Sequence, residues 1–220
     1  VELIRRADGD KVHALATPLI TKADGTKFGK TESGTIWLDP KRTSVYQFYQ
    51  FWINTDDRDA VRYLKFFTLL PQDTIMALEV SHTANPAQRD AHKALAKEMT
   101  TVLHGEAACR AAEQATAILF GGSVEELTAE TFGILRGEVP SGTTTKDQLS
   151  AGLPIVEALV ATNLSASKGQ ARKDIEGGGV YVNGVRVTEV TRPVTTADLL
   201  HGEGVLLRKG KRAYAVLTAS

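Results

Sequence analysis

Two lysines lie three residues apart in a short segment that is rich in glycine and threonine. The segment, residues 25–31, reads GTKFGKT. Each ammonium is a compact charge with several donors on a flexible stem, so Lys27 and Lys30 are suited to hold an anionic ligand. Over a triphosphate they would stabilise the charge that develops on a leaving pyrophosphate, and a mobile loop would form that contact mainly in the transition state. A solvated polar loop without a ligand explains the same residues.

The spacing of this segment differs from that of a phosphate-binding P-loop. A P-loop requires four residues between its first glycine and its Gly-Lys-Thr sequence. Only three residues, TKF, stand at this place, and residues 32–35, ESGT, open no clear helix. The spacing therefore disfavours a P-loop nucleotide hydrolase.

A second group of polar and basic residues lies in the C-terminal part of the chain. The sequence SKGQ at 167–170 predicts a helix that begins with a capping box. The free N–H groups at such a helix start attract phosphate, and basic residues follow in the helix and at a later turn. We expect this group to bind an RNA backbone through shape and phosphate rather than through base identity, although a solvated basic rim remains an alternative. The candidate RNA-binding residues are Ser167, Lys168, Gln170, Arg172, Lys173, Lys209, Lys211 and Arg212.

The distribution of charge agrees with a local RNA-binding surface. The chain has 26 basic and 26 acidic residues, which argues against a uniformly basic nucleic-acid coat. Residues 36–150 contain 11 Lys and Arg against 15 Asp and Glu, whereas residues 151–220 contain 9 against 6. A basic tail beside an acidic middle fits an RNA contact, and ordinary surface variation explains the charges equally well.

The composition indicates a globular protein of the reducing cytoplasm. Of 220 residues, 42% are apolar and 24% are charged, and no apolar run is long enough to span a bilayer. The single cysteine, Cys109, excludes an internal disulfide framework and is expected to pack as a small hydrophobe in an alanine-rich helix. The five histidines show no metal-ligand spacing, so we expect no metal site.

The first two segments of the chain have different periodicities. Residues 1–38 contain strand-like runs at 1–4, 12–15 and 18–20, with a turn at Asp24-Gly25 before the glycine-punctuated loop. Residues 39–136 are predicted to form a helical bundle, because helix follows helix without strands. Its aromatic residues at 46–52 are expected in the core, and Asn85 with Pro86 is expected to start a helix. Asp56 and Asp57 are expected to cap a helix rather than read bases.

The last part of the sequence predicts a linker and an α+β module. Residues 137–152 are rich in glycine and threonine, so a hinge or semi-flexible tether is expected. Residues 153–220 predict two helices, with Ala171 and Ile175 facing inward from the second, and then two hairpins. The first hairpin carries Asn183-Gly184, which is the signature of a type I′ turn.

Several of these stretches resemble one known family. Residues 18–31, PLITKADGTKFGKT, closely resemble the signature loop of bacterial tyrosyl-tRNA synthetases, in which the class I KMSKS motif takes the form KFGK followed by Thr or Ser. The likeness continues at 37–40, WLDP, and 49–55, YQFWINT, and resumes at 167–173, SKGQARK. It spans nearly the whole chain in the family's order. The tail also resembles the small αL RNA-binding domain of a ribosomal protein and of pseudouridine synthases.

The resemblance implies an α+β fold with four consecutive parts. Residues 1–38 would be the C-terminal edge of a Rossmann-type catalytic domain, carrying the KMSKS-type loop. Residues 39–136 would be a helical anticodon-binding bundle, residues 137–152 a linker, and residues 153–220 the αL-type RNA-binding domain.

The resemblance also implies a tyrosine–tRNA ligase. Tyrosine would react with ATP, accompanied by Mg²⁺, to give tyrosyl-adenylate and pyrophosphate, and the tyrosyl group would then pass to tRNA(Tyr). By position, Lys27 and Lys30 take the two motif lysines and are the candidate catalytic residues. The ATP-binding set is Lys27, Phe28, Gly29, Lys30 and Thr31. The full-length enzyme is expected to be a cytoplasmic homodimer with no membrane partner.

The second family signature, the HIGH-type tetrapeptide that contacts ATP, has no match in the sequence. His104-Gly105-Glu106 and His201-Gly202-Glu203 have the wrong pattern, and the chain opens with Val1 rather than Met. We therefore expect a C-terminal half that does not form tyrosyl-adenylate alone. The alternative is a non-enzymatic RNA-binding protein that retains a synthetase-like loop.

Overall fold

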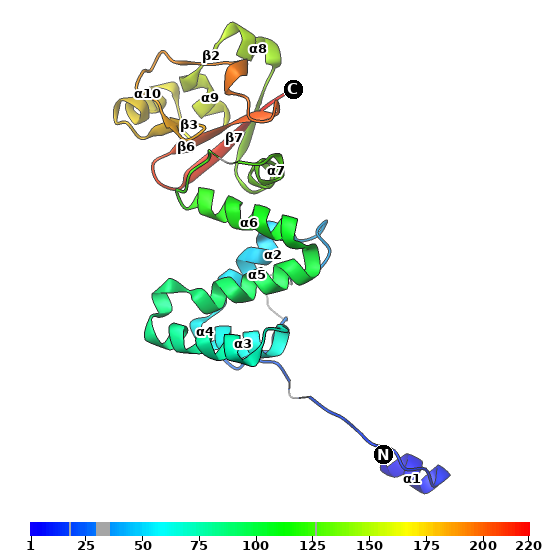
Figure 1. Cartoon of the computed structure of the whole chain (residues 1–220). Coiled ribbons are helices and arrows are strands. Elements are labelled where there is room, and N and C mark those ends of the chain that lie inside the picture. Colours follow the sequence, from blue (N-terminus) through cyan, green and yellow to red (C-terminus); the bar gives the residue numbers. More distant parts are fainter. Residues whose placement is uncertain (18, 30–35, 126) are drawn as a thin grey trace.

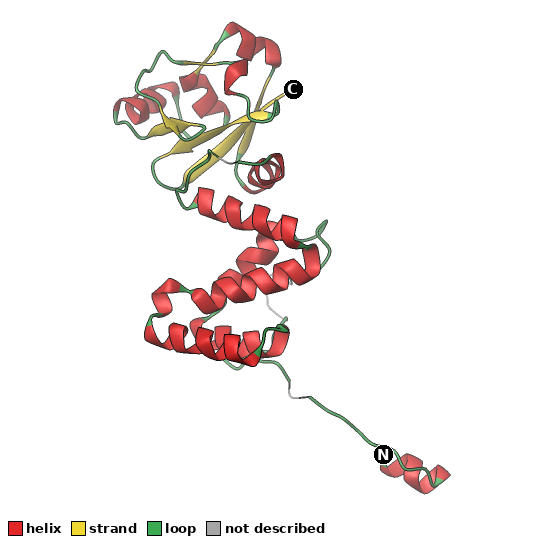
Figure 2. Ribbon diagram, in the orientation of Figure 1, coloured by secondary structure: helices red, strands yellow, loops and turns green. Residues whose placement is uncertain are grey.

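The computed structural model describes residues 1–17, 19–29, 36–125 and 127–220. Along the chain, an extended N-terminal segment leads into a group of helices, and a sheet-containing part follows at the C-terminal end (Figure 1). The strands are gathered in that last part, whereas the middle of the molecule is entirely helical (Figure 2). No described helix has the length and apolar character needed to cross a membrane.

The N-terminal segment differs from the sequence prediction. Residues 1–4 do not form a strand, because α1 (Glu2–Asp8) begins there; its C-cap is Gly9, which has a φ of 73°. Glu2 forms ion pairs with Arg5 and Arg6 at helical spacing, which favours the helix over an extended run. Residues 12–15 pair with no described strand. Of the predicted run at 18–20, Pro18 lies outside the described residues.

The middle of the chain forms a helical bundle, as the sequence predicts. Ser44 caps the first helix by accepting a hydrogen bond from the Gln47 N–H, and Asp56 caps the next through the Arg58 N–H, which confirms its capping role. The aromatic helix buries Phe48, Tyr49 and Trp52, as expected. The elements are α2 (Val45–Ile53), α3 (Asp57–Phe67), α4 (Gln72–Ala84), the 3₁₀ turn η1 (Pro86–Gln88), α5 (Asp90–His104) and α6 (Glu106–Leu119).

Two details of the bundle test local predictions. Pro86 starts only the short η1 turn, and the Asn85 side chain makes no capping hydrogen bond. Arg89 then adopts a left-handed φ of 56°, so the long helix α5 begins at Asp90 instead. Cys109 is 1% exposed in α6, and burial raises the pKa of its thiol. It is a packed residue, as predicted.

The C-terminal part is built on a five-stranded sheet with strand order β1-β7-β6-β3-β4. The β1–β7 pair is parallel and the other pairs are antiparallel, while β2 and β5 form a separate two-stranded sheet. Its elements are α7 (Ala129–Glu138), β1 (Ser141–Thr144), α8 (Lys146–Ala151), β2 (Leu153–Pro154), α9 (Ile155–Ala161), α10 (Lys168–Glu176), β3 (Val180–Val182), β4 (Val185–Arg186), β5 (Pro193–Val194), η2 (Thr196–Asp198), β6 (Gly204–Lys209) and β7 (Ala213–Ala219).

The predicted tether at residues 137–152 is wrong. Residues 141–144 form β1, which pairs with β7 in the register Ser141↔Val216. Thr145 then starts α8 with a complete capping box, and Leu149 is fully buried. Gly142 has a packing role, because a Cβ there would lie 2.5 Å from the Ala161 carbonyl oxygen. Most of the segment that suggests a flexible tether therefore has regular secondary structure, in the end of α7, in β1 and in α8.

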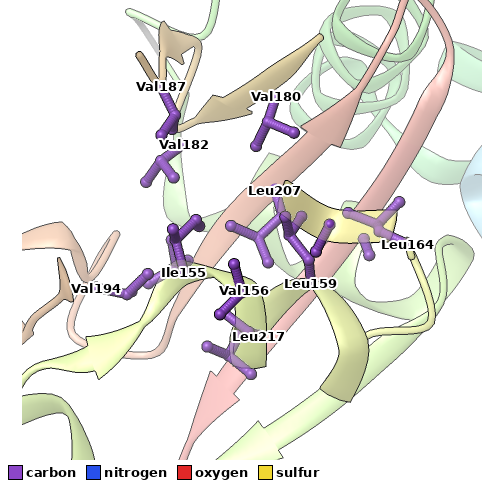
Figure 3. Packing of buried hydrophobic residues seen from close by; sticks show 14 of the residues in the cluster. Ile155, Val156, Leu159, Leu164, Val180, Val182, Val187, Val194, Leu207 and Leu217 are labelled. Atoms are coloured by element: carbon purple, nitrogen blue, oxygen red, sulfur yellow. The ribbon is translucent and has the colours of Figure 1, made fainter. Parts of the chain in front are cut away.

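Both faces of the sheet are covered. Along β6, Leu207 faces the core of α9 and α10, while Leu206 faces α6 and α7, as strand alternation requires. Figure 3 shows residues of α9 such as Ile155 and Leu159 packed toward Leu207. On the other face, the Tyr214 hydroxyl donates to the Ile118 carbonyl of α6 at 2.6 Å. The helical bundle and the sheet are thus joined by direct packing.

The first predicted hairpin and the second helix of the tail are confirmed. Asn183 has a φ of 49° and Gly184 a φ of 82°, the two positive values that a type I′ turn needs. Ala171 and Ile175 point into the core with exposed fractions of 0% and 1%.

Candidate functional site

Residues 20–28 form a small hairpin, which we call the 20–28 hairpin. Thr21 and Lys27 form an antiparallel bridge, and the Lys22 N–H donates to the Thr26 carbonyl at 2.8 Å. The turn closes where the Gly25 N–H donates to the Lys22 carbonyl, with Gly25 at a φ of 83°. The predicted turn at Asp24-Gly25 is therefore confirmed.

The Asp24 carboxylate holds this turn in shape. It accepts hydrogen bonds from the Thr26 hydroxyl at 2.6 Å and from the Thr26 N–H at 2.9 Å. These two bonds, the hydroxyl first, lower the pKa of Asp24 below its usual value. The turn therefore carries an ionised carboxylate at neutral pH.

Lys27 and Phe28, which are neighbours in the predicted motif, face opposite ways. The ring of Phe28 packs into the bundle, 5.1 Å from both the Tyr63 and Phe67 rings and 5.9 Å from Trp52. Lys27, the preceding residue, is exposed. Successive side chains of an extended strand alternate between faces, so burial of Phe28 directs Lys27 to solvent. Gly29 is exposed with a φ of 79°.

This arrangement refines the predicted ATP-binding set. Lys27 and Gly29 present a charge and an open backbone, whereas the side chain of Phe28 is partly buried against the aromatic core. Lys30 and Thr31 lie outside the described residues.

A cavity of about 480 Å³ lies between the 20–28 hairpin and the helices α2 and α3. Polar groups line much of it, and Arg58 pairs there with Asp56 at 2.9 Å. Burial, aided by the nearby charge of Asp59, raises the pKa of the lining residue Tyr63 to about 12. Sequence reasoning missed this cavity, because its walls come from segments about thirty residues apart that carry no shared motif.

In the C-terminal part, Ser167 caps α10 as predicted. Its hydroxyl oxygen accepts a hydrogen bond from the Gln170 N–H at 3.2 Å. The Gln170 side chain does not return to the Ser167 backbone, as a capping box would require, and instead donates to the Asp174 carboxylate at 2.8 Å. The predicted capping box is thus half formed.

Two of the predicted RNA-binding cations are paired with carboxylates. Lys168 lies 2.6 Å from a Glu157 oxygen, and Lys209 lies 3.5 Å from an Asp174 oxygen. Burial acts to raise the pKa of Asp174, but the hydrogen bonds from Ser165 and Gln170 and the charge of Lys209 outweigh it and lower that pKa. Asp174 therefore stays ionised and holds both Gln170 and Lys209.

The other predicted cations are exposed and free of such pairing. Arg172 and Lys173 lie on the outer side of α10, and Lys211 and Arg212 lie in the turn between β6 and β7. None of these four forms an ion pair with a described residue. Arg212 also approaches the exposed ring of Phe120, with its guanidinium carbon 5.8 Å from the ring centre.

One further cationic residue was missed from the sequence. The Arg208 guanidinium lies over the Tyr181 ring at 3.8 Å. The two residues are directly opposite in the β3–β6 register, so a correct pairing of the two predicted hairpins would have found the contact. Among the described residues, no group of three His, Cys, Asp or Glu side chains is placed to hold a metal ion.

Comparison with known proteins decides the family. Residues 1–121 match the family described as tRNA synthetases class I (W and Y). The chain belongs to this family of class I tRNA synthetases. Residues 133–217 also match the C-terminal domain described as tyrosine–tRNA ligase SYY-like.

Several relatives of this class I synthetase chain are tyrosine–tRNA ligases. The protein from Roseiflexus castenholzii is 48% identical over 218 residues, which cover 99% of this chain and 51% of the relative. The proteins from Opitutus terrae and Bacillus caldotenax are also 48% identical, over 98% and 99% of this chain and 51% of each relative. The synthetase chain thus spans about half the length of these relatives. The resemblance to bacterial tyrosyl-tRNA synthetases is confirmed.

Proposed function

We propose that this chain is the C-terminal half of a tyrosine–tRNA ligase, in which the 20–28 hairpin contacts ATP and the C-terminal part binds tRNA(Tyr). The observation that carries the proposal is the exposed Lys27, set on a hairpin whose opposite side is fixed in the aromatic core by Phe28. The tyrosine–tRNA ligases that match 98–99% of this chain support the substrate assignment. A non-enzymatic RNA-binding protein is not favoured, because both matched families are synthetase domains.

In the proposed first step, the tyrosine carboxylate attacks the α-phosphorus of ATP, and the bond to the bridging oxygen of pyrophosphate breaks. Negative charge grows on the leaving phosphates. Lys27, together with Lys30 as assigned from the sequence, would neutralise that charge, and an electrostatic contact of this kind needs no general acid or base. Gly29 and Thr31 would add backbone and hydroxyl contacts. Mg²⁺ would enter bound to the phosphates of ATP.

In the proposed second step, a ribose hydroxyl of the 3′-terminal adenosine of tRNA(Tyr) attacks the tyrosyl carbonyl carbon of the adenylate, and the anhydride bond to AMP breaks so that AMP leaves. The exposed cations Arg172, Lys173, Lys211 and Arg212 support a contact with the tRNA backbone, because each can meet a phosphate without first breaking an internal ion pair. Lys168, Lys209 and Gln170 would act mainly by shaping this surface, and Ser167 by capping α10.

The remaining assignments follow from the family. We propose that residues 1–38 are the edge of the catalytic domain and that the helices from 39 onward form the anticodon-binding domain. We place the start of the RNA-binding module near residue 133 rather than 153, because α7 and β1 pack on its sheet. The full-length enzyme would work as a cytoplasmic homodimer.

Complementation tests the proposal. This chain alone should show no tyrosine-dependent exchange of pyrophosphate into ATP. Mixing it with the separately produced N-terminal half of its parent protein should restore exchange. Pyrophosphate exchange by this chain alone would contradict the proposal that it is only the C-terminal half of the enzyme. So would the absence of exchange from the mixture when the intact parent protein is active.

A further inference from the structure

The turn of the 20–28 hairpin is attached to the bundle by one buried carboxylate. The Ala23 N–H donates to Asp59 Oδ2 at 2.8 Å, and Asp59 is only 3% exposed. A buried polar group is stable only when it has a hydrogen-bond partner, and the Ala23 N–H supplies one to Asp59 Oδ2. This bond therefore ties the turn of the hairpin to α3.

The helix α3 does not itself require a carboxylate at this position. Its N-cap is Asp56, which already accepts the Arg58 N–H. Asp57 supplies another acidic group to the first turn, where negative charge is favourable. Burial of Asp59 is thus explained by its contact with the hairpin rather than by capping of α3.

The next turn of α3 extends the same contact. The Tyr63 hydroxyl lies 3.4 Å from the Thr21 carbonyl, and Arg62 reaches the Thr21 hydroxyl at 3.4 Å. Residues four apart share one face of a helix, so Asp59 and Tyr63 meet the hairpin together. The Tyr63 ring also touches Phe28, with ring centres 5.1 Å apart. One face of α3 thus contacts the turn and both strands of the hairpin.

We propose that Asp59 is a positioning residue for the ATP-binding hairpin, through its hydrogen bond to the Ala23 N–H. It fixes the hairpin on α3, so that Lys27 is presented at a defined place for tyrosine activation. This inference rests on the proposed function of Lys27. Misplacement of a catalytic group by about 1 Å can cost on the order of 100-fold in rate, so loss of the contact should reduce activation without removing the charge itself.

The contact can be removed from either side. Asp59→Ala removes the acceptor, and Ala23→Pro removes the donor without any change in α3. Proline suits this site, because Ala23 is the second residue of the turn. Asp59→Asn retains an oxygen acceptor, so it should rescue the contact. Asp73→Asn, an exposed position in the first turn of α4, is the matched control for lost charge.

The first measurement is limited trypsin digestion of this chain, with cleavage after Lys27 followed by mass spectrometry. Cleavage after Lys22 is not scored, because Ala23→Pro creates a Lys–Pro bond there that trypsin does not cut. Asp59→Ala and Ala23→Pro should each increase cleavage after Lys27 about tenfold, and the double variant should show no further increase, because both changes remove one contact. Asp59→Asn and Asp73→Asn should stay within about threefold of the wild type. Unchanged cleavage in Asp59→Ala, or in Ala23→Pro if Asp59→Ala does not fold, would overturn the inference.

The second measurement is pyrophosphate exchange by the full-length protein, in which the Lys27→Ala variant is measured for comparison. Asp59→Ala and Ala23→Pro should each lower exchange about tenfold, mainly through kcat, with a smaller change in the KM for ATP. If Lys27→Ala lowers exchange while Asp59→Ala and Ala23→Pro retain it, the positioning role of Asp59 fails and the proposed function stands. If Lys27→Ala has no effect, the proposed function fails and with it the positioning role.

Discussion

The two regions that present cations differ in how those cations are held. Lys27 is the fully exposed lysine of the 20–28 hairpin, where Lys22 is half-buried, and the reverse side of the hairpin contacts the bundle through the Phe28 ring and the Asp59 carboxylate. The C-terminal surface carries several cations, of which Lys168 and Lys209 are paired internally. One fixed charge suits a step that needs exact placement, whereas a spread of free charges suits an RNA backbone, where each phosphate contact contributes similarly.

Removing the fixed charge should have the largest effect. Lys27→Ala in the full-length protein should lower pyrophosphate exchange by about 100-fold, as loss of one preorganised electrostatic contact usually does. Binding of tRNA should remain unchanged, as measured by filter retention. Lys97→Ala, an exposed lysine of α5, is the matched control. A tRNA affinity that falls together with exchange would remove the distinction between the two regions.

Removing two free charges of the tail should affect only RNA binding. The double variant Arg172→Ala/Lys173→Ala should weaken tRNA affinity roughly tenfold and reduce the slope of log K against log salt by about 2, since each phosphate contact contributes about one. Lys168→Ala should change the affinity less, because its charge is already paired with Glu157. If Lys168→Ala weakened tRNA binding as much as the Arg172→Ala/Lys173→Ala variant, the ion pair with Glu157 would not limit the contribution of Lys168.

Freeing a paired charge should strengthen RNA binding slightly. Asp174→Asn removes a negative charge from this surface and releases Lys209. A Coulomb interaction of about 1 kcal/mol near the surface predicts a tRNA affinity increased about two- to fivefold, measured at low salt. Asp198→Asn, a change of equal charge beside Arg192, is the control. A weaker affinity in Asp174→Asn would indicate that this carboxylate is needed to arrange the surface.

The helix cap should have the smallest effect. Ser167→Ala leaves the Gln170 N–H without its hydroxyl acceptor and should lower the free energy of unfolding by about 1 kcal/mol, measured with urea. Ser150→Ala, whose hydroxyl donates only to a carbonyl of its own helix, should lower it less. A loss above about 3 kcal/mol would mean that Ser167 does more than cap α10.

Local signals predicted the parts of the fold that depend on neighbouring residues. The turn at Asn183-Gly184, the Ser167 cap and the buried face at Ala171 and Ile175 follow from short patterns, and all three are present. The strand β1 was missed because its partner β7 is about seventy residues away, and isolated glycines and threonines resemble a tether. The N-terminal run was misread because its apolar residues meet no strand among the described residues.

In the candidate sites, too, the sequence did not predict contacts between residues that are far apart along the chain. Residue types and order predicted Lys27 and the cations of the tail as site residues, and that assignment stays a prediction. They did not reveal that Phe28 packs against the aromatic core, that Asp59 accepts a hydrogen bond from the hairpin, or that Asp174 pairs with Lys209. Each of these contacts joins elements whose pairing depends on the tertiary fold.

The central claim is that Lys27 meets the phosphates of ATP as the adenylate forms. Rapid-quench measurement of tyrosyl-adenylate formation in the full-length protein, at varied ATP concentration, separates the rate constant of the first step from the affinity for ATP. For Lys27→Ala we predict a rate constant about 100-fold lower, with the dissociation constant for ATP changed less than about fivefold. A normal rate constant would contradict the assignment of the 20–28 hairpin.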